Sequence, residues 1–281
     1  MFPIRAAATL GPDLTRLDIE APDLARAAEP GQFLMLRVDE RGERIPLTIA
    51  DSDPDAGTVS VIFLAVGKTT RQLSRLRAGD AILDVAGPLG NHMEIEKVGT
   101  VVCVGGGVGV PALYPKARAL KQAGNRVISI IGARTAELLV LVDEMTAVSD
   151  EVRITTDDGS RGRKGLVSDE LADMLKDPSS RVDLVVAVGP IPMMAAVAQT
   201  TRPYGVKTLV SLNPIMVDGT GMCGGCRVTV GGKTRFACVD GPVFDGHEVD
   251  FAELAQRQKR FDDFERRAKE AYEHACRLRQ A

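Results

Sequence analysis

The first hundred residues alternate short apolar runs with turn residues. Four such runs are FLMLRVDE, IPLTIAD, GTVSVIFLAV and DAILDVAGPLG, and glycine, proline or aspartate borders each of them. Runs this short and this rich in branched side chains predict β-strands. Their density predicts a small β-barrel or sandwich, with one helix over Thr69 to Leu76 between two of the strands.

From residue 99 the pattern changes to longer buried runs that alternate with helical segments. TVVCVGGGVGV, RVISIIGAR, VRITTDD and VDLVVAVGP read as strands, and a helical segment follows each of them. Strands that alternate with helices predict a parallel sheet with helices on its faces. This architecture is typical of nucleotide-binding proteins, although a fold alone does not fix a function. The last segment, from Phe251, is helical and highly charged.

Composition excludes several classes of protein. The chain has 281 residues and a net charge of −3, so it lacks the basic excess typical of nucleic-acid binding. No run of eighteen apolar residues occurs, which predicts that the chain has no membrane span. The N-terminal residues carry charges and no apolar stretch of the signal-peptide kind. We therefore expect the cytoplasm, where structural disulfides are rare.

Three of the five cysteines lie within sixteen residues, in the glycine-rich stretch DGTGMCGGCRVTVGGKTRFACVDG. In a reducing compartment such clustering suggests metal or redox chemistry. Cys223 and Cys226 form a C-x2-C pair, and a hairpin around the GG dipeptide would fold Cys238 back onto that pair. Asp218 is the best local candidate for a fourth ligand, and His247 is an alternative.

Spacing alone leaves three interpretations of this stretch open. An iron–sulfur cluster takes mostly cysteine ligands in loops whose amides can donate to sulfur. A zinc site prefers four cysteine or histidine ligands, and no histidine lies between Cys223 and Cys238. A redox C-x-x-C pair or an ordinary loop would not need Cys238.

Two stretches of the strand-rich part are candidates for flavin binding. RIPLTIAD is a strand that could present backbone and hydroxyl groups to a ring and an arginine to a phosphate. FLAVGKTTRQLSRL leads into a helix N-terminus, which favours phosphate binding. An ordinary strand and a plain capped helix, with Thr69 or Thr70 as the N-cap, fit equally well. The candidate residues are Arg44, Pro46, Leu47, Thr48, Phe63, Leu64, Ala65, Gly67, Lys68, Thr69 and Thr70.

The stretch VVCVGGGVGVPALYP is the candidate for a dinucleotide pyrophosphate, because it places glycines between a strand and a helix. The G-x-G-x-x-G spacing is incomplete, since Val110 holds its last position. The glycines of this turn are Gly105, Gly106, Gly107 and Gly109.

Further candidates lie at the ends of other strands of the same part. Asp157, at the end of VRITTDD, would favour a ribose 2′-hydroxyl, whereas Arg134 would favour a 2′-phosphate; we expect NADH over NADPH. Gly189 and Pro190 end a late strand and could face the nicotinamide. A turn before a buried helix explains this last pair equally well.

The order of these parts resembles the ferredoxin–NADP⁺ reductase superfamily. The GGGVG turn, the GPIPMM segment and the three-cysteine loop resemble more closely the electron-transfer subunits of dihydroorotate dehydrogenase B. They also resemble the small subunits of NADH-dependent reduced ferredoxin:NADP⁺ oxidoreductases. The resemblance covers roughly residues 44–250, and its most specific part is SLNPIMVDGTGMCGGCRVTVGGKTRFACVDGPVFDGHEVDF.

The resemblance implies three cofactors: FAD, NAD(H) or NADP(H), and a 2Fe–2S cluster. It implies cluster ligation by Asp218, Cys223, Cys226 and Cys238, with aspartate where the dihydroorotate relatives carry their first cysteine. It further implies that NADH gives a hydride to the flavin and that electrons then pass singly to the cluster. Thr48, expected near flavin N5, is the candidate catalytic residue.

Two positions depart from the superfamily pattern. Ile45 intervenes between Arg44 and Pro46, where the flavin signature usually has an arginine directly before the proline. Val188 stands where the superfamily often has a cysteine before the Gly-Pro pair, so we propose no catalytic thiol there.

The resemblance also implies a partner and a division of the chain. The implied partner is a larger glutamate-synthase-like flavoprotein subunit with 4Fe–4S clusters, through which ferredoxin is reached, in a heterodimer that could bifurcate electrons. The expected segments are an FAD-binding β-barrel (1–98), an NAD(P)-binding α/β domain (99–210), a 2Fe–2S segment (211–250) and a C-terminal helix (251–281). The alternatives are an accessory subunit of a dihydroorotate dehydrogenase and a zinc-stabilised nucleotide-binding regulatory protein.

Overall fold

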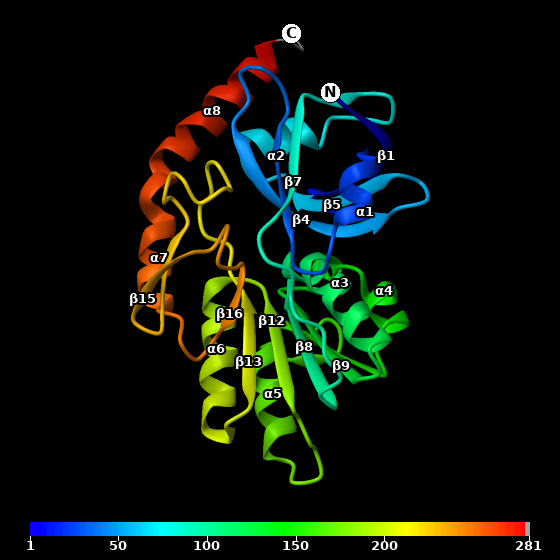
Figure 1. Ribbon diagram of the computed structural model, residues 1–281, viewed down its shortest axis with the longest axis vertical. Helices are drawn as coiled ribbons and strands as arrows, with labels where there is room; N and C mark the ends of the chain where they lie inside the picture. The colour runs from blue at the N-terminus through cyan, green and yellow to red at the C-terminus, as the bar shows by residue number, and fades with distance from the viewer. Residues whose placement is uncertain (279–281) are drawn as a thin grey trace.

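The computed structural model describes residues 1–278, and its first part is an antiparallel barrel sheet (Figure 1). The strand order is β6-β1-β2-β5-β4-β3-β7. Two short helices, α1 (Pro22–Ala27) and α2 (Lys68–Leu73), accompany the sheet. Its strands are β1 (Phe2–Gly11), β2 (Leu14–Glu20), β3 (Phe33–Arg37), β4 (Arg44–Asp53), β5 (Thr58–Leu64), β6 (Ala81–Ile82) and β7 (Asp84–Leu89).

Strand β3 explains how the barrel joins the rest of the molecule. Side chains alternate between the two faces of a strand, yet the first four residues of β3 are all buried. Leu34 and Leu36 pack inside the barrel. Phe33 and Met35, on the opposite face, pack in a core shared with later parts of the chain. Both faces of this strand are therefore covered by protein.

The second part is a sheet of order β11-β10-β9-β8-β12-β13-β16. Six of its strands are parallel, and β16 runs antiparallel to β13. The strands are β8 (Thr100–Gly106), β9 (Arg126–Ala133), β10 (Glu151–Thr156), β11 (Arg163–Lys164), β12 (Leu184–Val188), β13 (Lys207–Ser211) and β16 (Val243–Asp245). The strand order reverses at β8, with β9 on one side and β12 on the other, and ligands bind at such switch points in open α/β sheets.

Helices cover both faces of this sheet. Helices α3 (Gly109–Gln122) and α4 (Val142–Ala147) pack on one face. Helices α5 (Val167–Lys176) and α6 (Ile191–Thr201) pack on the other. Two 3₁₀ turns, η1 (Ala136–Leu138) and η2 (Arg202–Tyr204), complete the connections. The apolar runs of the central strands are thus buried on both sides, as a covered parallel sheet requires.

The cysteine-rich stretch lies between β13 and β16 and contains the expected hairpin. Its strands are β14 (Arg227–Val230) and β15 (Lys233–Phe236). Gly231 and Gly232 between them have φ values of +58° and +71°. A two-residue hairpin turn with positive φ at both positions favours glycine in each, so the local sequence dictates this turn.

The described part of the chain ends in two helices, where the sequence predicted one. Helix α7 (Phe251–Gln258) continues through the 3₁₀ turn η3 (Lys259–Phe261) into α8 (Asp262–Leu278). Helix α8 rises beside the barrel in Figure 1, where Arg71 of α2 pairs with Glu273 at 3.0 Å. This contact shows that the terminal helix packs on its own chain.

Several local predictions differ from the structure. The expected helix over residues 69–76 begins at Lys68 and ends at Leu73, and its N-cap is Gly67. The run DAILDVAGPLG forms two strands, β6 and β7, and the first two strands, β1 and β2, are not predicted from the sequence.

Within the described chain no helix is long and apolar enough to cross a membrane. The division into four segments stays a prediction.

Candidate functional site

The glycine turn after β8 meets the end of β12. Val188 of β12 pairs with Gly105 of β8. A Cβ on Gly109 would lie 2.2 Å from the carbonyl oxygen of Val188, and a Cβ on Gly106 would lie 2.4 Å from Sδ of Met193. Only glycine permits this approach of the α3 N-terminus to the β12 turn. The fold thereby brings the predicted pyrophosphate turn and the predicted nicotinamide turn together.

Other positions of these two turns suit a ligand. A Cβ on Gly107, where φ is +53°, would meet no atom within 4 Å, so this residue borders open space. The fourteen-residue helix α3 starts beside it, and a helix N-terminus attracts anions through its free amides and dipole. Gly189 lies against Gly106, since a Cβ on Gly189 would stand 3.3 Å from the Gly106 nitrogen.

Arg134 and Asp157 occupy the carboxyl ends of the neighbouring strands β9 and β10. The Asp157 amide donates to the Ala133 carbonyl at 3.1 Å, and both Arg134 and Asp157 are exposed. The structure therefore places both candidates for recognition of the ribose at one sheet edge, although Arg134 would favour a 2′-phosphate and Asp157 a 2′-hydroxyl.

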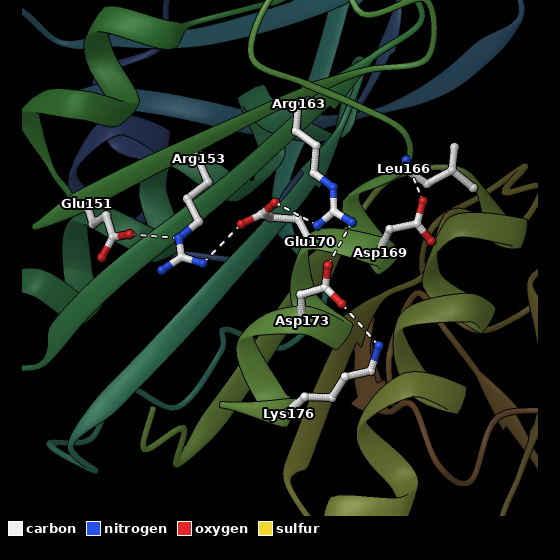
Figure 2. Close-up of polar contacts among 8 residues, drawn as sticks. All are labelled: Glu151, Arg153, Arg163, Leu166, Asp169, Glu170, Asp173 and Lys176. Carbon is white, nitrogen blue, oxygen red and sulfur yellow. Dashed lines mark hydrogen bonds and ion pairs between the residues drawn. The ribbon is translucent and has the colours of Figure 1, made fainter. Parts of the chain in front are cut away.

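Two arginines of β10 and β11, Arg153 and Arg163, are neutralised by a chain of ion pairs (Figure 2). Arg153 bridges Glu151 at 2.7 Å and Glu170 at 3.0 Å. Arg163 bridges Glu170 at 3.0 Å and Asp173 at 2.7 Å. These contacts join β10 and β11 to α5. Because their charges are already paired, Arg153 and Arg163 are poor candidates for binding a 2′-phosphate.

The candidate flavin strand β4 lies beside α3. Arg118 of α3 forms an ion pair with Asp51 of β4, with 2.8 Å between Nη2 and Oδ1. Arg44 is exposed at the start of β4, whereas Pro46, Leu47 and Thr48 are half-buried. The half-buried stretch of β4 therefore adjoins the helix that carries the glycine turn.

In the second candidate flavin stretch, Phe63 is buried in the core, whereas the residues around the start of α2 form hydrogen bonds through their side chains or backbone. The Phe63 side chain is 3% exposed and packs in the barrel core, so only its backbone can face a ligand. The Gly67 amide donates to the Thr70 hydroxyl at 3.0 Å. The Thr69 hydroxyl donates to Glu43 at 3.0 Å. Glu43 has no distinguishing sequence signal, and it also stands 4.0 Å from the Lys68 ammonium.

The cysteine loop gathers its four candidate ligands in two pairs. The Sγ atoms of Cys226 and Cys238 are 3.2 Å apart, and both residues are buried. The Asp218 carboxylate accepts the Thr220 amide at 3.0 Å and the Cys223 amide at 2.8 Å. The bond from the Thr220 amide, followed by the other amide contacts, holds the pKa of Asp218 below its usual value despite some desolvation. Asp218 is therefore ionised at neutral pH.

This donor set fits a two-iron cluster better than a single metal ion. Each iron of a 2Fe–2S cluster takes two protein ligands, which matches two pairs of side chains. In the described part of the chain no three histidine, cysteine or acidic side chains converge on one metal position. His247 instead hydrogen-bonds the Thr201 hydroxyl of α6 at 2.9 Å. The alternative of a zinc site completed by His247 is therefore not supported by the geometry.

Backbone amides around the cysteines also suit a cluster. The Gly221 amide donates to Sγ of Cys238 at 3.2 Å, and the Gly225 amide donates to Sγ of Cys223 at 3.4 Å. Hydrogen bonds to ligand sulfur are among the features that set the potential of a cluster.

The loop is seated on the barrel. A Cβ on Gly219 would lie 2.7 Å from Cγ of Met35 and 3.0 Å from Cδ1 of Leu89. Asn91 donates from its side chain to the Val239 carbonyl at 3.0 Å. The candidate ligands therefore lie against strands β3 and β7, on the same body as the candidate flavin strand.

Comparisons with known proteins identify the family. Residues 213–250 match the model of the iron–sulfur cluster binding domain of dihydroorotate dehydrogenase B. The dihydroorotate dehydrogenase B electron-transfer subunit homologue of Thermotoga maritima is 51% identical, over 88% of this chain and 87% of that protein. The electron-transfer subunit of Bacillus velezensis is 37% identical, over 79% of this chain and 87% of that protein. The chain belongs to this family of electron-transfer subunits.

Solved structures agree with this membership. A chain of the NADH-dependent reduced ferredoxin-NADP oxidoreductase, studied for flavin-based electron bifurcation, is 47% identical with a TM-score of 0.91. That match covers 97% of this chain and 98% of the other. The ferredoxin reductase of carbazole 1,9a-dioxygenase is 22% identical with a TM-score of 0.61, over 73% of this chain and 65% of that one, and shows the fold alone.

These matches confirm the predicted fold class of a flavin-type barrel, a nucleotide-binding sheet and an iron–sulfur segment. They confirm an oxidoreductase subunit that transfers electrons, and they support FAD, a 2Fe–2S cluster and NADH as its cofactors. An electron-transfer subunit of this kind acts with a larger catalytic subunit. The individual cofactor contacts stay predictions.

Proposed function

We propose that the chain is the small subunit of an NADH-dependent reduced ferredoxin:NADP⁺ oxidoreductase. The observation that carries this proposal is the loop of three thiols and one carboxylate seated on the barrel. The match to the solved oxidoreductase along nearly the whole chain supports it. In this role the subunit moves electrons between NADH, FAD and a 2Fe–2S cluster.

The chain's own residues bind and orient the reactants. When bound, the flavin exchanges an electron pair as hydride, and the cluster exchanges electrons singly. The amides after Gly107 hold the NADH pyrophosphate, and the turn at Gly189 and Pro190 positions the nicotinamide. Thr48, a half-buried residue of β4, would donate a hydrogen bond from its hydroxyl to the flavin ring near N5. No side-chain acid or base is required for hydride transfer.

The cluster is held by Asp218, Cys223, Cys226 and Cys238. The two buried thiols form one ligand pair, and the ionised Asp218 with the exposed Cys223 forms the other. A carboxylate is a harder ligand than a thiolate. Its presence therefore distinguishes this site from an all-cysteine one.

The partner is a larger glutamate-synthase-like flavoprotein subunit with 4Fe–4S clusters, which gives access to ferredoxin in a heterodimer. The cytoplasm is the proposed compartment, because the clustered cysteines are assigned to a cluster and not to disulfides, which are rare in reducing compartments.

Metal and flavin content of anaerobically purified protein tests the proposal. We expect about two iron, two sulfide and one FAD per chain, as one 2Fe–2S cluster and one flavin require. One zinc with no flavin would contradict the proposal. Co-expression with the larger subunit should then give a complex that oxidises NADPH only when both NAD⁺ and ferredoxin are present. Oxidation of NADPH without ferredoxin would exclude the bifurcating form.

A second candidate is the electron-transfer subunit of a dihydroorotate dehydrogenase. The identity of 37% to the Bacillus velezensis subunit favours it. Reduction of NAD⁺ by dihydroorotate, after reconstitution with a dihydroorotate dehydrogenase catalytic subunit, would support this candidate over the first.

A further inference from the structure

A cavity of about 190 Å³ borders the outer side of the cysteine loop. Cys223 and Gly225 form part of its wall, and Leu254 and Phe261 of the C-terminal helices close another side. Three arginines line the same cavity: Arg227, Arg257 and Arg260. Arg227 is close to Cys223 in the sequence. Arg257 of α7 and Arg260 of η3 lie more than thirty positions after Cys223, and the fold brings them to the same cavity.

Arg257 contacts the loop directly. Its Nη2 donates to the Gly225 carbonyl at 3.3 Å. The amide of the same residue, Gly225, donates to Sγ of Cys223 at 3.4 Å. Gly225 lies between the candidate ligands Cys223 and Cys226. It therefore accepts a hydrogen bond from Arg257 at its carbonyl and donates one from its amide to a ligand sulfur.

In the described part of the chain, the three arginines that line this cavity have no carboxylate partner in contact with them. Among the described residues none of the three forms an ion pair with a carboxylate within 4 Å, in contrast to the arginines of Figure 2. Desolvation, followed by the charges of Arg260 and Arg227, lowers the pKa of Arg257, and the nearby Glu253 and Cys226 offset this only in part. The pKa of an arginine is so high that Arg257 remains charged at neutral pH.

Unneutralised cations beside a cluster have a direct electrostatic consequence. The transfer of one electron from reduced flavin to the cluster adds one negative charge beside the loop. Fixed positive charges stabilise that added charge, more strongly where water is excluded. Arg257 is half-buried, while Arg227 and Arg260 are exposed and more strongly screened by salt.

We propose that Arg227, Arg257 and Arg260 raise the reduction potential of the cluster, with Arg257 as the dominant positioning residue. This inference rests on the proposed function, because it requires the cluster. Two of the three arginines lie in the C-terminal helices. These helices would therefore help to set the difference in reduction potential between the flavin and the cluster.

Redox titration of the purified chain, followed by electron paramagnetic resonance of the reduced cluster, tests this inference. We expect Arg257→Gln to shift the cluster's redox equilibrium about tenfold toward the oxidised form, which corresponds to about 59 mV for one electron. Arg227→Gln and Arg260→Gln should give smaller shifts in the same direction. Arg257→Lys keeps the charge and should restore most of the wild-type potential. Arg181→Gln, an exposed position distant in the fold, is the matched control and should shift nothing.

Iron and sulfide content, measured first, separates the possible failures. A wild-type chain without iron and sulfide overturns the proposed function itself. A full cluster with an unchanged potential in Arg257→Gln and Arg260→Gln overturns only the inference. If Arg257→Gln loses the cluster because the loop is no longer held, Arg260→Gln decides, since among the described residues Arg260 forms no hydrogen bond to the loop backbone, whereas Arg257 does.

Discussion

Arg118 of α3 and Asp51 of β4 form an ion pair that joins the helix behind the glycine turn to the candidate flavin strand. The Tyr114 ring lies 5.2 Å from the Arg118 guanidinium carbon and supports the same side chain. The pair therefore helps to fix the distance between the nucleotide turn and the strand that carries Thr48.

We expect Arg118→Gln to weaken this connection with a small loss of stability. Both side chains are about one-third exposed, and such pairs contribute at most about 1 kcal/mol. A double-mutant cycle with Asp51→Asn, measured by urea unfolding, should give a coupling energy in that range. Arg126→Gln removes a looser, more exposed ion pair and is the control. A coupling energy of zero would show that packing of α3 alone joins the two elements.

Replacement of Thr48 by valine should slow reduction of the flavin by NADH. Valine keeps the branched shape and removes the hydroxyl, and loss of one hydrogen bond of about 1 kcal/mol corresponds to a slowing of about fivefold to tenfold. Stopped-flow absorbance at the flavin band measures this rate. Thr48→Ser retains the hydroxyl and should stay near the wild-type rate. Equal rates in the wild type and the valine variant would exclude the proposed role.

Asp218→Cys should retain a cluster with a different midpoint potential. The change replaces a carboxylate ligand by a thiolate, which alters the charge distribution and the hydrogen bonds around the iron. Redox titration and iron content are the measurements. Asp218→Ala removes both the ligand and the acceptor of two amides, so we expect it to lose most of its iron. A titration curve identical to the wild type would show that Asp218 is not a ligand.

Lys116 predicts a specific dependence of stability on pH. This residue of α3 is fully buried, donates to the Ala112 carbonyl at 2.8 Å, and burial lowers its pKa from 10.5 to about 8. Between these two values the unfolded chain binds more protons than the folded one, so the free energy of unfolding contributed by Lys116 rises with pH.

Lys116→Met should remove that contribution and stabilise the protein at pH 7 by up to about 3 kcal/mol, the value of the pKa difference. Urea unfolding at pH 7, 8 and 9 measures both effects. Lys176→Met, at an exposed lysine, is the control and should leave the pH dependence unchanged. A variant with the wild-type slope between pH 8 and 9 would contradict the assignment to Lys116.

Gly109→Ala should weaken both stability and NADH binding. The added methyl group would lie 2.2 Å from the backbone oxygen of Val188, so α3 has to move away from β12. Overpacking of this kind costs about 1–3 kcal/mol. Gly11→Ala, where a Cβ meets no atom within 4 Å, is the matched control. Thermal unfolding and NADH titration of both variants would detect the difference, and equal behaviour would show that the turn can relax.

The sequence predicts best what depends on neighbouring residues. The hairpin that returns Cys238 to Cys226 follows from the GG dipeptide and the strand residues around it. The meeting of the glycine turn with Gly189 follows from parallel strands, whose carboxyl ends share one sheet edge. Both features depend on backbone rules that act over a few residues or along one sheet.

Long-range packing explains what the sequence does not reveal. The contact between Arg257 and the loop at Gly225 joins residues 32 positions apart, and no local pattern marks either of them as partners. The burial of Lys116 depends on how α3 meets the barrel. His247 is near the cysteines in sequence, yet the pairing of β16 with β13 carries it to α6.

Phe33 and Met35 of the barrel share one hydrophobic core with Cys226 and Cys238 of the loop. Until the loop is folded, the outer face of β3 lacks its covering and exposes apolar side chains to solvent. A substitution that keeps the loop from folding should therefore leave a newly made chain open to proteases and aggregation, even though the barrel strands themselves are unchanged.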